Sequence, residues 1–244
     1  MAPRRPFVAV VLIGALGVTV AGCFNPFRPL ISGLTSFVEP APSPTNPQGV
    51  VRLFKWCWEN RDISKYREIF TDDYRFAFSI TDSAGVPYKG NPWTREDELA
   101  SAEHLFVGGS ASEPAASSIT LIFDGDLTAQ NDFRDGKTAR WHQQIQIANL
   151  TLTINRSDGS AVRVTGGALF YLVRGDSAVI PQELVDRGFR ADSTRWYIER
   201  WEDQTNVGAG AASLSPVFEA SAPALLESPA RMSWGLVKRI WRER

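Results

Sequence analysis

The chain has 244 residues and a net charge of −1, with 26 Lys and Arg against 27 Asp and Glu. This balance excludes a general nucleic-acid-binding protein, which would carry a basic excess. Eight tryptophans and fourteen phenylalanines indicate a large aromatic core or an apolar cavity, and two cysteines are too few for a disulfide framework.

The first 22 residues have the pattern of a secretory signal. Arg4 and Arg5 precede an almost uncharged stretch, residues 7–20, that is too short to cross a bilayer comfortably. This stretch runs into the sequence VAGC, which ends at Cys23 and resembles the lipobox of bacterial lipoproteins. In that family the chain is cut before the cysteine, which then carries a diacylglycerol and usually a further acyl chain such as palmitate. The resemblance implies that residues 1–22 are removed and that Cys23 is a lipid anchor.

The anchor predicts a location. The alternative to lipidation is an ordinary secretory signal followed by a chance cysteine. Two or more acyl chains hold a protein durably on a membrane, so the lipobox predicts a cell-envelope protein on the periplasmic or cell-surface side. In well-studied diderm lipoproteins an Asp after the cysteine retains the protein in the inner membrane, so Phe24 favours the outer membrane. Residues 23–47, rich in Pro, Ser and Asn, are expected to form a flexible tether.

Residues 48–205 are expected to form one folded domain that opens with two helices. Between Val50 and Trp58 apolar residues recur at helical spacing and form one wide stripe. Asp62 is a typical N-cap, and the apolar spacing over residues 63–70 predicts a second, shorter helix.

A strand and a third helix are expected next. Residues 71–73, Thr-Asp-Asp, interrupt the helical pattern, and apolar residues then alternate with others from Tyr74 to Ile80. This period of two predicts a strand with one buried face. Thr94 and Asp97 form a typical capping box at the start of the third helix, which is expected to end at a Gly-Gly pair.

The remainder of the domain is predicted to be antiparallel strands. Apolar residues change from odd-numbered positions, up to Ile147, to even-numbered positions, from Leu150 on, which predicts a bulge near Ala148-Asn149. Asp158-Gly159 is a typical hairpin turn. Helices followed by such strands predict an α+β fold with a curved sheet wrapped over the helices. The strands are expected at residues 117–123, 140–155, 161–175 and 194–203, with a loop over residues 176–193.

This order of elements resembles the nuclear transport factor 2-like superfamily, which includes ketosteroid isomerases, scytalone dehydratases and polyketide cyclases. The likeness is carried by VVRLFKWCWENRDISKYREIFTDDYRF, residues 50–76, and by the final WYIERWED, residues 196–203. It implies a cone-shaped antiparallel sheet packed on three N-terminal helices, with an apolar pocket at the open end of the cone. The residues expected to line this pocket are Phe54, Trp58, Tyr66, Phe76 and Phe78.

The resemblance does not carry over the catalytic groups. The isomerases of this superfamily use a Tyr on the first helix as oxyanion donor and an Asp on the first strand as base. Phe54 and Phe78 stand at these places, and a phenyl ring can neither donate a hydrogen bond nor take a proton. His142 is the remaining acid–base candidate, paired with Tyr66 or Tyr171, although a strand histidine can equally face water.

Two further residues have structural explanations. His104 is placed in the last turn of the third helix, where an imidazolium suits the helix dipole. Cys57 lies on the apolar stripe of the first helix and is expected to be a buried, inert thiol. The histidines lack metal-ligand spacing, so we expect no metal and no cofactor.

The C-terminal residues 206–244 are expected to form a linker and a basic amphipathic tail. Residues 206–230 are rich in Gly, Ala, Ser and Pro. The tail can lie on an anionic membrane surface, or it can dock on its own domain or on a partner. Gly235 weakens an isolated helix and so favours docking. In a helix, Trp234, Val237, Ile240 and Trp241 share one face, with Arg231, Lys238, Arg239, Arg242 and Arg244 mostly elsewhere.

Two function classes follow. The first is a non-catalytic binding module of the cell envelope, which holds an apolar small molecule in the cone or meets an envelope protein. The second is an enzyme of the cyclase, dehydratase or isomerase type that acts on an apolar small molecule in the same pocket. A third possibility is a cone filled by its own aromatic side chains. The missing catalytic groups favour binding over catalysis.

Overall fold

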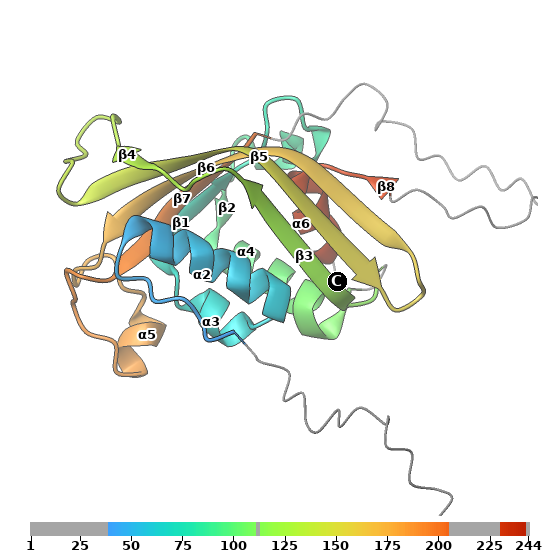
Figure 1. Ribbon diagram of the computed structural model, residues 1–244, viewed down its shortest axis with the longest axis horizontal. Helices are drawn as coiled ribbons and strands as arrows, with labels where there is room; N and C mark the ends of the chain where they lie inside the picture. Colours follow the sequence, from blue (N-terminus) through green and yellow to red (C-terminus); the bar gives the residue numbers. More distant parts are fainter. Residues whose placement is uncertain (1–38, 111–112, 205–229, 243–244) are drawn as a thin grey trace, which may run out of the picture. The chain divides into compact units, whose positions relative to one another are not determined.

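The computed structural model describes residues 39–110, 113–204 and 230–242, and the part from Ala41 onward forms one compact unit (Figure 1). The predicted signal, the lipidation site Cys23, most of the tether and nearly all of the linker lie outside the described residues.

The domain opens with helices α2 (Pro47–Asn60) and α3 (Ile63–Arg67). Asn46 caps α2, because its side-chain oxygen accepts a hydrogen bond from the Gly49 amide at 2.7 Å. Asp62 caps α3 in the same way and accepts from the Lys65 amide at 2.8 Å, which confirms the predicted N-cap.

The third predicted helix is α4 (Arg95–Glu103), which a π-helical turn, η3 (His104–Gly108), extends. The capping box is confirmed, since Thr94 accepts from the Asp97 amide and the Asp97 carboxylate accepts from the Thr94 amide at 3.0 Å. Figure 1 shows α2, α3 and α4 together on one side of the sheet.

The first strand differs from the prediction at both ends. β1 (Phe70–Ala77) begins before the Thr-Asp-Asp stretch, because Phe70 already pairs with Ile198 of β7 (Trp196–Gln204). Residues 71–74 lie within a register shift between this pair and the next one, Arg75 with Arg200. It also ends earlier than expected. Ile80 is fully exposed rather than on the buried face.

The sheet is curved and mostly antiparallel, with helices packed against one face, which confirms the predicted α+β fold (Figure 1). Two pairings are parallel rather than antiparallel: β1 with β7, and β8 (Ala230–Arg231) with β6. The strand order is β2-β1-β7-β6-β5-β3, with β2 at Trp93–Thr94, β3 at Ala116–Asp124, β5 at His142–Arg156 and β6 at Ala161–Arg174, while β4 (Ala129–Asn131) pairs with β5.

A bulge bends the two longest strands where the sequence predicts it. The register of β5 against β6 shifts between Ile147 and Leu150. Gly167 lies opposite, and a Cβ there would approach the Ile147 carbonyl oxygen to 2.9 Å, which explains the need for glycine.

The core lies between the helices and the sheet and combines aliphatic side chains with many aromatic ones. A second, smaller apolar cluster contains Val173 and Tyr197 of the strands. The segment expected to be a plain loop, residues 176–193, contains the short helix α5 (Gln182–Asp186), which places Leu184 in this cluster.

The C-terminal helix α6 (Trp234–Arg242) docks on its own domain. Trp234, Val237 and Trp241 are buried in the main core, as the predicted apolar face requires. Lys238 is buried with them and does not lie on the polar face. The described end of the chain therefore belongs to the same core as the first helix.

Candidate functional site

Four of the five predicted pocket residues are buried in the core, and the rings of Phe54, Trp58 and Tyr66 contact one another. Phe54 packs edge-on against Trp201 and Phe170, with ring centroids 5.0 and 5.1 Å apart. Trp58 meets Trp234 of α6 in the same geometry at 5.0 Å. The described interior is thus filled by side chains of the chain itself, with Phe54, Trp58, Tyr66 and Phe76 each at most 3% exposed.

The fifth residue, Phe78, lies at the edge of this cluster, where its ring meets that of Phe76 edge-on at 4.9 Å. It is half-buried and stacks on Tyr88, with ring centroids 4.8 Å apart and planes 8° from parallel. Phe78 and Phe76 contribute to an open hollow at the end of β1, which is separate from the centre of the core.

A buried carboxylate lies among the aromatic side chains of the interior. Glu98 on α4 is 1% exposed. Its oxygens accept hydrogen bonds from the hydroxyl of Tyr66 at 2.7 Å and the hydroxyl of Tyr74 at 3.2 Å. The indole N–H of Trp93 donates to it at 3.1 Å. Burial, and then the negative charge of Glu98, raise the pKa of both tyrosines well above the usual value, which keeps them as hydrogen-bond donors.

The fourth partner of this carboxylate comes from the C-terminal helix. The ammonium of Lys238 forms an ion pair with both oxygens of Glu98 and is 2% exposed. It lies 4.1 Å from the ring centroid of Trp201 and 4.6 Å from that of Phe76, within the range of cation–π attraction. Burial lowers the pKa of Lys238 to about 8, although Glu98 opposes the change.

Several contacts hold α6 over this interior. Ser233 caps its first turn and donates to the buried Asp82 carboxylate at 2.5 Å. Further along, Ser101 donates to the Lys238 carbonyl at 2.8 Å, and Arg242 pairs with Asp97 at 2.9 Å. The helix therefore closes the interior and also supplies the cation that neutralises Glu98.

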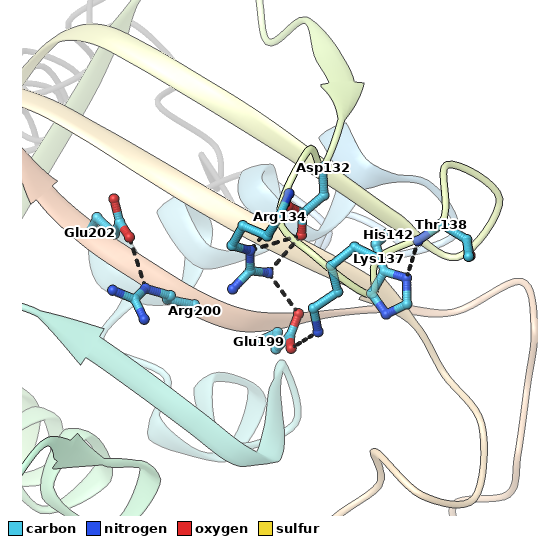
Figure 2. A network of polar contacts seen from close by, with 8 residues as sticks. All are labelled: Asp132, Arg134, Lys137, Thr138, His142, Glu199, Arg200 and Glu202. Carbon is cyan, nitrogen blue, oxygen red and sulfur yellow. Dashed lines mark hydrogen bonds and ion pairs between the residues drawn. The ribbon is translucent and has the colours of Figure 1, made fainter.

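His142, the predicted acid–base candidate, lies on the other face of the sheet. Its neighbours Ile145 and Ile147 point into the core, so the alternation along β5 directs His142 away from it. Tyr66 is buried in the core, and the structure does not bring these two residues together. The Nδ1 atom of His142 accepts a hydrogen bond from the Thr138 amide at 3.2 Å (Figure 2).

A network of ion pairs occupies the sheet face beside His142 (Figure 2). Arg134 pairs with Asp132 at 2.6 Å and with Glu199 of β7 at 3.0 Å, and Lys137 pairs with Glu199 as well. Burial alone would raise the pKa of Asp132, but its hydrogen bonds from Arg134 outweigh burial and lower it. The Arg134 guanidinium also covers the Tyr171 ring at 3.8 Å, so Tyr171 has a structural partner already.

His104 and Cys57 have structural roles. The His104 ring is hydrogen-bonded through Nδ1 to the Trp241 carbonyl at 2.7 Å and so joins the π-helical turn to α6. Cys57 is buried, and burial together with the charges of Asp62 and Glu68 raises the pKa of its thiol. A protonated, inaccessible thiol is inert.

An open hollow of about 570 Å³ lies where β1 ends. Its wall comes from β1, from the loop with the 3₁₀ helix η2 (Ser83–Tyr88), and from Arg200 of β7. Cations and apolar groups share this wall. They include Arg75, Lys89, Arg200, Phe78, Ile80, Val86 and Tyr88.

Metal sites and membrane-spanning helices were also sought in the described residues. Within residues 39–110, 113–204 and 230–242, no three acidic, histidine or cysteine side chains gather closely enough to hold a metal ion. In the same part of the chain, no helix has the length and apolar character needed to cross a bilayer.

Sequence reasoning missed the residues at the centre of the interior. Glu98 belongs to an acidic run at the start of a helix, and such runs usually face water. It lies four residues before the buried Ala102, however, and so on the same face of the helix. Lys238 lies four residues after Trp234 and three before Trp241. Residues three and four apart share a helix face, so this spacing was a signal that Lys238 is buried.

Comparison with known proteins finds similar solved structures but no matching family. No protein-family model matches the chain, and no curated protein matches it. Among solved structures, a nuclear transport factor 2-like superfamily protein from Salmonella enterica is similar, with 14% identity, a TM-score of 0.39, and coverage of 66% of this chain and 92% of that one.

Two enzyme structures have a similar sequence identity and TM-score. A putative aromatic ring hydroxylase from Novosphingobium aromaticivorans has 15% identity and a TM-score of 0.41, over 64% of this chain and 82% of that one. A hexachlorocyclohexane dehydrochlorinase has 10% identity and a TM-score of 0.41, over 65% and 82%. At these identities and TM-scores, the similarity assigns no activity to this chain.

Proposed function

We propose that this chain is a non-catalytic binding module, anchored by lipid on Cys23 to a bacterial membrane outside the cytoplasm. One observation carries the non-catalytic part. The interior carboxylate, Glu98, is bonded to Lys238 and to three neutral donors of the same chain. A general base must reach a substrate proton, and α6 closes Glu98 off from any substrate.

The enzyme alternative has less support. It requires two polar groups that converge in a cavity, and His142 and Tyr66 lie on opposite faces of the sheet. Tyr171 shares the face of His142, but its ring lies under Arg134. The open hollow beside β1 offers cations and apolar groups, which suit binding better than proton transfer.

The membrane part of the proposal rests on the sequence. The VAGC motif supports lipidation of Cys23, and Phe24 supports the outer membrane over the inner one. With Cys23 acylated, the module would work at the surface of the membrane, on a small molecule or an envelope protein.

The test compares the full chain with a Cys23→Ser form in a bacterial host. Cells are fed an alkyne analogue of palmitate, fractionated, and probed for the chain. We expect labelled full chain in the membrane fraction and unlabelled Cys23→Ser chain in the soluble fraction. Native mass spectrometry of the soluble form then detects a retained ligand. Unlabelled full chain, or identical fractionation of the two forms, refutes the anchor. Conversion of a retained ligand into a new product refutes the non-catalytic role.

A further inference from the structure

Two arginines oppose each other on neighbouring strands beside the hollow. Arg75 of β1 and Arg200 of β7 are direct partners in the parallel ladder, and both contribute to the hollow. Like charges directly opposite each other destabilise a strand pair. The arrangement therefore needs a negative charge nearby.

The chain supplies that charge only in part. Arg200 pairs with Glu202 at 2.8 Å, on a partly exposed surface (Figure 2). Arg75 donates to the backbone carbonyls of Tyr74 at 2.7 Å and Asp73 at 3.3 Å, and it has no carboxylate partner among the described residues. A carbonyl oxygen carries no full charge, so the guanidinium of Arg75 is left without a counter-ion.

The hollow is also lined by a third cation, Lys89, and by one acidic residue, Asp82. Lys89, exposed at the end of η2, forms no ion pair within the described ranges. Asp82 is the one acidic residue among the described lining, and its carboxylate already accepts from Ser233 at 2.5 Å and from the Ala84 amide at 2.8 Å. The hollow is thus cationic on a chain whose net charge is negative.

The other wall of the hollow is apolar and open to water. Ile80 is fully exposed and Val86 is 57% exposed, next to the stacked rings of Phe78 and Tyr88. Large exposed apolar side chains grouped in one place are typical of interaction sites. The volume of about 570 Å³ is within the range of small-molecule sites.

We propose that the hollow binds a free amphiphilic anion. Its carboxylate or phosphate head would lie between Arg75, Arg200 and Lys89, because guanidinium groups bind such heads with two parallel hydrogen bonds. The apolar body would cover Ile80 and the Phe78–Tyr88 pair. The inference rests on the proposed binding function and adds the place and the ligand class.

The test is calorimetric titration of the full chain carrying Cys23→Ser with decanoate, kept below its micelle concentration. Decanol and decylammonium, which have the same alkyl chain length as decanoate, are the neutral and cationic control ligands. We expect saturable binding of one decanoate, binding of decanol weaker by about tenfold or more, and no binding of decylammonium.

Variants locate the site. Arg75→Gln and Lys89→Gln should each weaken decanoate binding by about three- to tenfold, and Ile80→Ser should weaken decanoate more than hexanoate. Arg52→Gln is the matched control, since Arg52 is also an exposed cation but lies on α2, outside the hollow. Circular dichroism checks that each variant is folded.

Three outcomes overturn the proposal: no decanoate binding, equal affinity for decanol and decanoate, or unchanged binding in Arg75→Gln. Phosphatidylglycerol vesicles form a separate arm. Lys89-dependent vesicle binding without binding of monomeric decanoate would replace the free ligand by a membrane surface. None of these results alters the palmitate-labelling test, so failure of this inference and failure of the anchored module are distinguishable.

Discussion

Lys238 and Glu98 form a buried ion pair between residues 140 positions apart in the chain. Lys238 belongs to α6, and Glu98 belongs to α4, the helix that directly follows β2. Removing two charges from water is expensive, and the attraction between them repays this cost only with additional hydrogen bonds. Tyr66, Tyr74 and Trp93 supply those bonds. The pair therefore specifies how α6 docks, rather than adding much stability by itself.

The first prediction concerns loss of the cation. Lys238→Met keeps an unbranched side chain beside the aromatic rings but leaves the Glu98 carboxylate buried without a counter-ion. We expect the free energy of unfolding to fall by about 3–5 kcal/mol, measured by urea denaturation. Adding Glu98→Gln should restore most of the loss, because the carboxylate that lost its counter-ion is then replaced by a neutral amide. Equal stability of Lys238→Met and the parent would contradict this account.

The second prediction is the sign of a pH effect. Folding lowers the pKa of Lys238 to about 8, against about 10.4 for a free lysine. Between these values the unfolded chain binds more protons, so this residue makes the free energy of unfolding rise with pH. Folding raises the pKa of the Cys57 thiol and so acts in the opposite direction over much of the same range.

Comparison with Lys238→Met isolates the lysine, since Cys57 contributes equally to both chains. The parent should gain stability over the variant as pH rises from 8 to 10, in urea titrations at fixed salt. Above pH 10 the raised pKa values of Tyr66 and Tyr74 should lower the stability of both chains. A difference that stays constant from pH 8 to 10 would show that Lys238 does not titrate there.

Local signals in the sequence predicted much of the fold. Asp62 and the Thr94–Asp97 box start helices where expected, because capping depends on residues three positions apart. The bulge after Ile147 was predicted because the apolar residues change from odd-numbered to even-numbered positions there. Side chains alternate between the two faces of a strand, so this change marks an extra residue in the strand. The start of β1 was missed because its pairing with Ile198 is a long-range contact.

The interior could not be predicted in the same way. The expectation of a pocket at Phe54 and Trp58 came from the shape of a cone, and it took no account of what α6 adds. Whether a curved sheet encloses a cavity depends on side chains that arrive from the far end of the chain. The partnership of Glu98 with Lys238 is of this kind, since no local pattern links the two.

The third prediction concerns the start of α6. Gly235 is in a helix, where alanine normally stabilises by about 1 kcal/mol. Here a Cβ would approach Cδ1 of Phe78 to 2.5 Å and would also strike the Asp82 carboxylate. Gly235→Ala should therefore destabilise by about 1–3 kcal/mol in urea. Gly90→Ala is the control, because a Cβ there meets nothing within 4 Å, and it should be nearly neutral. A stabilising Gly235→Ala would show that α6 is not held this closely.

The fourth prediction concerns the network in Figure 2. Asp132→Asn removes the charge that holds Arg134 in place, and with it the link from the hairpin loop to Glu199. We expect a loss of about 1–3 kcal/mol at pH 7, measured by thermal and urea unfolding. Because folding lowers the pKa of Asp132, its contribution is present at neutral pH and disappears as pH falls below about 4. The parent and the variant should therefore converge in acid. Asp135→Asn, an exposed change in the same loop, should have little effect, and an equal effect of the two substitutions would argue against a specific role for Asp132.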